Sequence, residues 1–282
     1  MIMCENIDFS YRKDQKLFNN LSASFEGSHI YGLLGKNGAG KTTLLKCICG
    51  LLHPSSGNIT IYGKSVFKRL PSILSSIFFL PETFFIPDMS VEQYIKYYSP
   101  FYPNFNIKTF EDSSRVLEIE NEKKISSFSY GQKKKFLLAF GFATKAPIVI
   151  LDEPTNGLDI PSKTIIRKKI AESFTEEQSV IISTHQVRDL QQIFDSIIIL
   201  NDGKIIFNRS LELIAKNLAI VQVTNDDDKY ENTSSYFEQT PIGKIYLTKN
   251  EQNSSKQQPI DIEFLFNATI NNPDFVNSLF SN

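Results

Sequence analysis

A glycine-rich stretch at residues 35–43 constrains the fold of this chain more than any other feature of its sequence. The stretch reads Gly35-Lys36-Asn37-Gly38-Ala39-Gly40-Lys41-Thr42-Thr43. It fits the pattern G-x-x-x-x-G-K-[ST], in which glycines let successive backbone N–H groups point at one anion. An apolar run at 30–34 precedes it and another at 44–52 follows it, so the sequence predicts a buried strand, a phosphate-binding loop and a helix.

Two side chains at the end of this loop indicate what it binds. A triphosphate carries several negative charges, and the N-terminus of a helix beginning at Lys41 adds positive potential beside them. The pattern places the Lys41 ammonium on the β- and γ-phosphates and the Thr42 hydroxyl on Mg²⁺. The sequence therefore predicts a nucleoside triphosphate site that includes a magnesium ion.

The composition excludes several classes of protein. The 282 residues are 41% hydrophobic and 22% charged with a net charge of −1, so we expect a globular domain and no nucleic-acid partner. No apolar run approaches the roughly 18 residues of a membrane span, and the N-terminus has no secretory pattern. Three cysteines are too few for a disulfide framework, so we expect a reducing, cytoplasmic compartment, with the two at 47 and 49 as core or near-core thiols rather than metal ligands. The three are Cys4, Cys47 and Cys49.

Residues 1–27 alternate between apolar and polar side chains in the manner of strands. Residues 1–27 predict an antiparallel pair that turns at 12–15, with Tyr11 at the bend. The Tyr11 ring could stack on a nucleotide base or could be a half-exposed aromatic of the sheet. Further strands are predicted at 57–63 and 77–80, and Glu82 follows the second of them.

Residues 83–146 predict a helical insertion between strands. Ser90 and Gln93 have the spacing of a capping box, and charged helical sequence extends from 109 to about 124. A Ser-x-Gly-Gln turn at Ser129 then opens another helix, which makes a second potential anion site. Three lysines at 133–135 lie in its first turn, where the sequence predicts solvated side chains or contacts with another part of the protein.

Carboxylates follow the most apolar strand of the sequence. The run at 148–151 has the composition of a buried parallel strand, and Asp152 and Glu153 come directly after it. A turn at 156–159 leads into a helix that opens near Pro161, and the strand at 180–184 ends at His185. Because ligands bind at the carboxyl ends of strands in open α/β sheets, these side chains are candidates for the same site as the loop.

The composition becomes more polar after residue 208. Asn, Ser, Gln and Asp accumulate at 225–228 and at 250–258, and short strands are predicted at 220–223 and 244–248. A last helix is predicted at 260–270. We therefore expect a main domain at 1–208, with its helical subdomain at about 83–146, and a small α+β appendage at 209–282.

Taken in order, these pieces resemble the ATP-binding subunit of ABC transporters over residues 1–208. The loop at 35–43 matches the Walker A motif, 148–152 matches Walker B with Glu153 after it, and 128–132 is similar to the signature motif. The turn at 156–159 resembles the D-loop, and His185 falls at the switch histidine. Tyr11 resembles the aromatic that stacks on adenine, so the resemblance favours the base-stacking interpretation.

The resemblance implies a fold and a mechanism. The fold is an α/β P-loop core with a mainly parallel sheet, an antiparallel β subdomain and an inserted helical subdomain. Two chains, as a homodimer or with a close paralogue, would pair head to tail around two ATP molecules. Asp152 would hold Mg²⁺ with Thr42, Glu153 would activate water, and His185 would contact the γ-phosphate. The nucleotide-binding residues implied are Tyr11, Gly35, Asn37, Gly38, Ala39, Gly40, Lys41, Thr42, Thr43, Ser129, Gly131, Gln132 and Asp159.

Two positions depart from the family pattern. Glu82 occupies the place of the usual Q-loop glutamine, and Tyr130 occupies the place of a usual signature glycine. A carboxylate at 82 would bind Mg²⁺ more strongly but would be repelled by phosphate oxygens, and we expect Glu82 to keep the metal-contact and coupling role. We expect activity to survive Tyr130, because Gly131 is retained.

The resemblance also implies a partner. Without a membrane span, the chain would act on a separate integral-membrane permease at the cytoplasmic face, and it looks most similar to export-type subunits. The alternative is a non-transport ABC ATPase acting on ribosomes or DNA. Residues 83–127 would carry the permease-facing surface, unless their rings form the core of the subdomain itself. The aromatic run consists of Phe84, Phe85, Tyr94, Tyr97, Tyr98, Phe101 and Tyr102.

Overall fold

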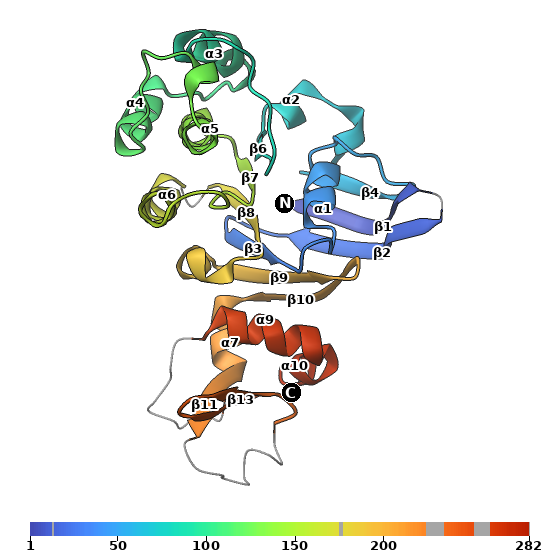
Figure 1. The fold of residues 1–282 in the computed structure, drawn as a ribbon. Coiled ribbons are helices and arrows are strands. Elements are labelled where there is room, and N and C mark those ends of the chain that lie inside the picture. The colour runs from blue at the N-terminus through green and yellow to red at the C-terminus, as the bar shows by residue number, and fades with distance from the viewer. Residues whose placement is uncertain (13, 175–176, 224–233, 251–259, 282) are drawn as a thin grey trace.

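A six-stranded sheet organises the protein, as Figure 1 shows. The computed structural model describes residues 1–12, 14–174, 177–223, 234–250 and 260–281. The strand order is β10-β9-β3-β8-β7-β6, and all neighbouring pairs are parallel except β9–β10. The strands are β3 (Ile30–Leu34), β6 (Ile77–Leu80), β7 (Ile148–Asp152), β8 (Ser179–Thr184), β9 (Ser196–Asn201) and β10 (Lys204–Ser210). The mainly parallel sheet expected from the apolar runs is confirmed.

An antiparallel sheet forms a second layer beside helix α1 (Lys41–Ile48). Its order is β2-β1-β4-β5, and its strands are β1 (Ile2–Arg12), β2 (Gln15–Phe25), β4 (Ser56–Ile61) and β5 (Lys64–Ser65). Helix α1 is shorter than the predicted 44–52, because Gly50 adopts a left-handed φ of 65° just after it. A short helix, α2 (Pro71–Leu74), and a 3-10 turn (Val66–Lys68) lead on to β6.

Three helices form the inserted subdomain above β6 and β7 in Figure 1. They are α3 (Val91–Tyr98), α4 (Ile107–Val116) and α5 (Tyr130–Thr144), with 3-10 turns at Ser99–Phe101 and Ile125–Ser127. The capping box at the start of α3 is present, since Ser90 Oγ accepts from Gln93 N at 3.1 Å and Gln93 Oε1 accepts from Ser90 N at 3.0 Å. Helix α4 ends well before the predicted 124, because Glu118 adopts a left-handed φ of 56°.

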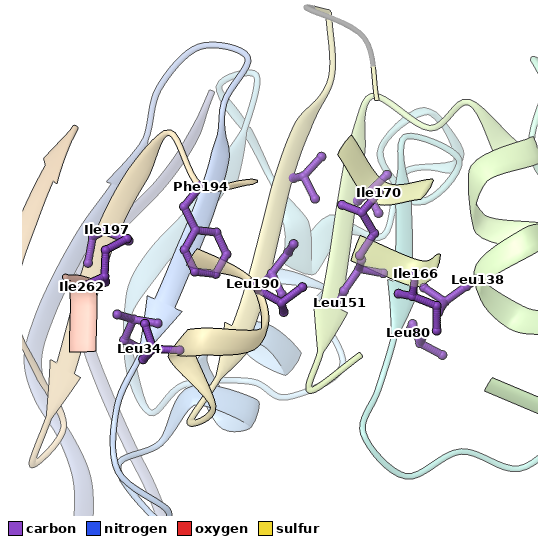
Figure 2. Close-up of a cluster of buried hydrophobic side chains, with 14 of the residues drawn as sticks. Leu34, Leu80, Leu138, Leu151, Ile166, Ile170, Leu190, Phe194, Ile197 and Ile262 are labelled. Atoms are coloured by element: carbon purple, nitrogen blue, oxygen red, sulfur yellow. The ribbon is translucent and has the colours of Figure 1, made fainter. Parts of the chain in front are cut away.

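The main hydrophobic core lies between the central sheet and the helices that cover it. Figure 2 shows Leu151 of β7 in a cluster with Leu138 of α5 and Ile166 of helix α6 (Ile160–Ser173). Two 3-10 turns, Val187–Asp189 and Gln191–Ile193, place Leu190 on the same side of the sheet. Burial of these apolar faces anchors the carboxyl ends of the strands, where the candidate site lies.

The C-terminal part packs against the edge strand β10. A three-stranded sheet, ordered β11-β13-β12, lies beside the helices. The elements are α7 (Leu211–Asn217), β11 (Leu218–Val223), β12 (Phe237–Thr240), β13 (Gly243–Lys249), α9 (Ile262–Asn271) and α10 (Pro273–Ser278). Ile262 joins the main core cluster, and Arg188 pairs with Glu263.

This part contains three elements that the sequence interpretation omitted, α7, β12 and α10. The predicted polar stretch at 225–228, and all of the one at 250–258 except Asn250, lie outside the described residues. Strand β10 runs across the predicted boundary at 208 to Ser210, and the division into two domains stays a prediction. Within the described ranges, no helix has both the length and the apolar character that crossing a membrane requires.

Candidate functional site

The glycine loop at 35–40 is a tight turn between β3 and α1. Gly40, just before α1, has a φ of 105°, and a Cβ there would lie 2.6 Å from Phe18 Cε1. A Cβ on Gly35 would lie 2.5 Å from the carbonyl oxygen of Leu200. Both positions therefore require glycine, one for its backbone conformation and both for space. The loop ends at the N-terminus of α1, where free N–H groups and the helix dipole favour an anion.

The Lys41 side chain is folded into the loop. Its Nζ atom donates to the carbonyl oxygens of Gly35 at 2.7 Å and Lys36 at 3.3 Å, and it lies 3.9 Å from Glu153 Oε1. Burial lowers the pKa of Lys41, while the neighbouring carboxylates of Glu153 and Asp152 act to raise it. A cation is therefore held ready at the place where phosphate oxygens would enter.

The Asp152 carboxylate at the end of β7 is fully buried and bonded to two hydroxyls. Thr42 Oγ1 donates to Asp152 Oδ2 at 2.7 Å, and Ser183 Oγ donates to Asp152 Oδ1. Ser183 is its register partner on β8. A hydroxyl and a carboxylate oxygen in contact at the edge of the loop are the hard oxygen donors that Mg²⁺ prefers. These residues therefore fit a magnesium ion.

The Glu153 carboxylate faces the loop and is held by His185. Glu153 Oε1 accepts from the His185 backbone N–H at 3.0 Å and lies 2.7 Å from His185 Nδ1. Glu153 is 4% exposed and has a left-handed φ of 49°. A buried carboxylate beside a lysine ammonium and an imidazole has the environment of a general base.

The two residues that depart from the family pattern contact each other. Tyr130, the first residue of α5, donates its hydroxyl to the carbonyl oxygen of Glu82, and its ring stacks on Phe84 with a centroid separation of 5.1 Å. Glu82 Oε1 accepts from Asn156 Nδ2 at 2.9 Å. Glu82 is therefore placed between the helical subdomain and the turn that follows β7.

These elements enclose a cavity of about 690 Å³. Tyr11 lies at its rim, with an exposed ring and a hydroxyl 2.9 Å from Thr43 Oγ1. The cavity is lined by Tyr11, Gln15, Lys16, Leu17, Asn37, Gly38, Gly40, Lys41, Thr42, Thr43, Glu82, Glu153, Asn156 and His185. The structure therefore brings the predicted loop residues, Tyr11, Glu82, Glu153 and His185 together. Three further predicted residues, Gly35, Ala39 and Asp152, support this site from behind its surface.

The other four predicted nucleotide-binding residues lie away from this cavity. Ser129 and Gln132 form a capping box on α5, with Ser129 Oγ accepting from Gln132 N at 3.2 Å, and Gly131 lies between them. Asp159 caps α6 by accepting from Ser162 N at 2.7 Å, and its hydrogen bonds to Ser162 lower its pKa. The resemblance implies that the signature turn contacts the nucleotide of a second chain and that Asp159 binds nucleotide, and both roles stay predictions.

Three polar residues near the site were not identified as functional in the sequence interpretation. Ser183 bonds Asp152, Asn156 bonds Glu82, and Lys134 donates to the turn after β7. The lysines at 133–135 were expected to be solvated or to contact another part of the protein, and Lys134 is 0% exposed. The sequence feature that could have indicated the burial of Lys134 is helical spacing, since position 134 shares a helix face with the buried Leu138 and Gly141.

The fold and this cavity define a P-loop nucleotide-binding domain, and comparisons with known proteins identify its family. The ABC transporter family model matches residues 18–156. The chain is 32% identical over 208 residues to the ABC transporter ATP-binding protein NatA of Bacillus subtilis, covering 71% of this chain and 85% of NatA. It is 27% identical to the Nod factor export ATP-binding protein I of Burkholderia lata, covering 68% of this chain and 65% of that protein.

The fold is also that of solved ABC cassettes. A bacterial ABC transporter cassette solved as a dimer superposes with a TM-score of 0.65 at 21% identity, covering 74% of this chain and 98% of the cassette. The chain therefore belongs to the ATP-binding proteins of ABC transporters, which are ATPases that supply the energy for transport. Neither the family model nor the relatives supports the alternative of an ATPase acting on ribosomes or DNA.

Proposed function

We propose that this chain is the ATP-hydrolysing subunit of an export-type transporter, that it works as a head-to-tail dimer, and that it drives a separate permease. The observation that carries the hydrolytic part is the arrangement around the glycine loop. Glu153 Oε1 lies 3.9 Å from Lys41 Nζ, and Thr42 is bonded to Asp152 at 2.7 Å. A base, a phosphate-binding cation and a hydroxyl line one cavity, and the carboxylate of Asp152 supports that hydroxyl from behind the surface.

The loop residues would bind the triphosphate of ATP. Lys41 would exchange its carbonyl partners for β- and γ-phosphate oxygens, and the Tyr11 ring at the rim would stack on the base. Thr42 and Asp152 would hold Mg²⁺, which when bound neutralises phosphate charge and orients the γ-phosphate. Glu82 lines the same cavity, where it accepts from Asn156, and it would join this set.

Glu153 would accept the proton of the attacking water. His185 holds the carboxylate through Oε1, so the other oxygen of Glu153 is the one that faces the water. Fixing the base before substrate arrives removes the cost of orienting it during the reaction. His185 is half-buried and lines the same cavity, which lets its ring turn toward the γ-phosphate.

The signature residues would complete the site of the other chain. Ser129, Gly131 and Gln132 lie at the N-terminus of α5, away from this chain's own cavity, and a helix N-terminus favours a phosphate. The head-to-tail arrangement is supported by the likeness to a cassette solved as a dimer. Closure of such a dimer around ATP, and its opening after hydrolysis, would move the attached permease.

The helical subdomain would bind the permease at the cytoplasmic face of the membrane. The predicted aromatic run divides into two groups in the structure, because Phe84, Tyr94, Tyr98 and Tyr102 pack against the core. Phe85, Tyr97 and Phe101 are 87%, 57% and 66% exposed, and they are the rings that remain for a partner. The export direction is supported by the similarity to a protein named for Nod factor export.

Two experiments test this proposal. Size-exclusion chromatography with ATP and Mg²⁺ should show a dimer for Glu153→Gln and a mainly monomeric wild type that hydrolyses ATP. A Glu153→Gln variant that hydrolyses ATP at the wild-type rate would refute the role of the base. A tagged chain purified from detergent-solubilised membranes should bring a polytopic membrane protein with it, and recovery of ribosomal or DNA-repair proteins alone would refute the transport role.

A further inference from the structure

We infer that Lys134 is a positioning residue for the catalytic base, which it acts on through the backbone of the turn at 153–156. Lys134 lies on α5, the helix whose first turn carries the signature residues. Its ammonium reaches across to the loop that follows β7. The inference rests on the proposed role of Glu153 and adds a residue outside the cavity to the machinery that sets its geometry.

The Lys134 ammonium is fully buried and satisfied by the turn. It donates to the carbonyl oxygen of Glu153 at 2.9 Å and to that of Asn156 at 2.8 Å. It also lies 5.4 Å from the centroid of the Tyr130 ring. An ammonium has three hydrogens, and two carbonyls and an aromatic face provide three acceptors for them. Such a cation stays buried only where its partners are fixed, so lysine and turn hold each other in place.

Three carboxylates balance the charge of this lysine. Burial lowers the pKa of Lys134, whereas Glu82, Glu153 and Asp152 act to raise it. The same carboxylates face the proposed phosphate and magnesium positions. Lys134 therefore adds positive charge beside the same three carboxylates that act on Lys41.

The turn needs such a support, because its first residue is strained. Glu153 has a left-handed φ of 49°, which costs a residue with a side chain about 1–2 kcal/mol. Strained backbone persists where surrounding contacts over-determine it. The Glu153 N–H is held by the carbonyl oxygen of Ser183 at 3.0 Å, and the Glu153 carbonyl accepts from Asn156 N at 3.2 Å and from Lys134. Lys134 thus fixes the backbone carbonyl of Glu153, the residue whose carboxylate would face the attacking water.

The contact also connects two functional regions of one chain. The N-terminus of α5 would bind the nucleotide of the partner chain, and the turn at 153–156 would act on this chain's own nucleotide. Lys134 joins them directly, and Asn156 extends the contact to Glu82 at 2.9 Å. A shift of α5 on binding the partner's nucleotide would therefore be transmitted to Glu153 by two hydrogen bonds and a single side chain.

Two substitutions separate hydrogen bonding from charge at this position. Lys134→Met keeps the length and apolar stem of the side chain but removes every donor. Lys134→Gln restores two N–H donors without the charge. Lys133→Met is the matched control, because Lys133 is a half-buried lysine one residue away that this mechanism does not use. Each full-length variant is assayed for ATP hydrolysis with Mg²⁺, for the Kd of a fluorescent ATP analogue, and for Tm.

We expect Lys134→Met to lower kcat by about tenfold to 100-fold, because a displacement of about 1 Å in a reacting group costs this much. KM and the Kd of the ATP analogue should change by less than about twofold, since the glycine loop is untouched. Lys134→Gln should recover part of kcat, and Lys133→Met should match the wild type.

A kcat for Lys134→Met within about twofold of wild type would overturn the inference while leaving the ATPase assignment intact. So would a loss of nucleotide affinity as large as the loss of kcat, because that result means general disruption of the site. If Lys134→Met fails to fold, the Lys134→Gln variant decides: a lowered kcat with unchanged KM supports the inference, and a kcat and KM equal to those of the wild type overturn it. Absence of hydrolysis by the wild type would overturn the proposed function and this inference together.

Discussion

Replacing Ser183 with alanine tests how tightly the buried carboxylate of Asp152 depends on its two hydroxyl partners. Asp152 is 0% exposed, and its oxygens accept from Thr42 and Ser183. The Ser183→Ala variant leaves Oδ1 of this buried carboxylate without that donor. A hydrogen bond to a charged group contributes about 1.5–3 kcal/mol. We therefore expect the free energy of unfolding to fall by about 2–3 kcal/mol.

Strand β8 provides the matched control. Ser179 also has a hydroxyl bonded across the structure, but its acceptor is the neutral carbonyl oxygen of Gly27 at 2.6 Å. Ser179→Ala should cost only about 1 kcal/mol. For a chain of this length 1 kcal/mol changes Tm by about 2–4 °C, so Ser183→Ala should lower Tm by about 4–12 °C and Ser179→Ala by about 2–4 °C.

Calorimetry or circular dichroism without nucleotide and Mg²⁺ measures this difference. Equal Tm shifts for the Ser183 and Ser179 variants would refute the reasoning, because they would mean that the charge of the acceptor does not matter. A second readout uses ATP hydrolysis at increasing Mg²⁺. The Asp152 carboxylate of the Ser183→Ala variant keeps only Thr42 as a partner, so more Mg²⁺ should be needed for half-maximal rate.

Three further predictions concern the rim, the metal and the core. Tyr11→Ala should raise the Kd of a fluorescent ATP analogue by about fivefold to 100-fold, because it removes the ring that stacks on the base. Tyr11→Phe keeps a ring, so a rise in Kd for Tyr11→Ala that is smaller than the rise for Tyr11→Phe would contradict base stacking. Glu82→Gln should raise the Mg²⁺ concentration for half-maximal hydrolysis by about threefold or more, and unchanged Mg²⁺ dependence, rate and transport would remove Glu82 from the metal site. Burial raises the pKa of the Cys4 and Cys47 thiols to about 12, so thiol reagents at pH 8 should label them only after unfolding. Because these raised pKa values favour the folded state below the unfolded thiol pKa near 9, stability should decline as pH rises from about 9 toward 12, as pH-dependent melting would show.

The features predicted correctly from the sequence are those whose cause is local. The glycine loop, the capping box at Ser90 and the apolar strands depend on residues a few positions apart, so their spacing indicates them. Carboxyl ends of parallel strands meet at one edge, which is why Asp152 and His185 were expected at the same site as the loop.

The features that were missed depend on contacts between distant residues. Glu82 and Asn156 are 74 positions apart, and no pattern in the sequence indicates the hydrogen bond between their side chains. Helix α4 ends at Val116, just before Glu118 adopts a left-handed backbone conformation. A charged residue rarely adopts this conformation, so the sequence did not indicate the end of the helix. Helix α7 did carry a local signal, because Ser210 caps it and accepts from Leu213 N at 3.2 Å, but its seven residues are too short for a clear periodicity.

The buried lysine of α5 has a physical reason that helical spacing alone does not reveal. Two carbonyls of the turn at 153–156 point toward that helix, and a buried carbonyl without a donor costs about 1–3 kcal/mol. An apolar residue at 134 would extend the core of Leu138 but would take this donor from both carbonyls. The lysine instead loses hydration of its charge, and Glu82, Glu153 and Asp152 offset part of that loss. A charged residue thus occupies a core position because the strained turn opposite it needs donors, and that need arises from residues about 20 positions further along the chain.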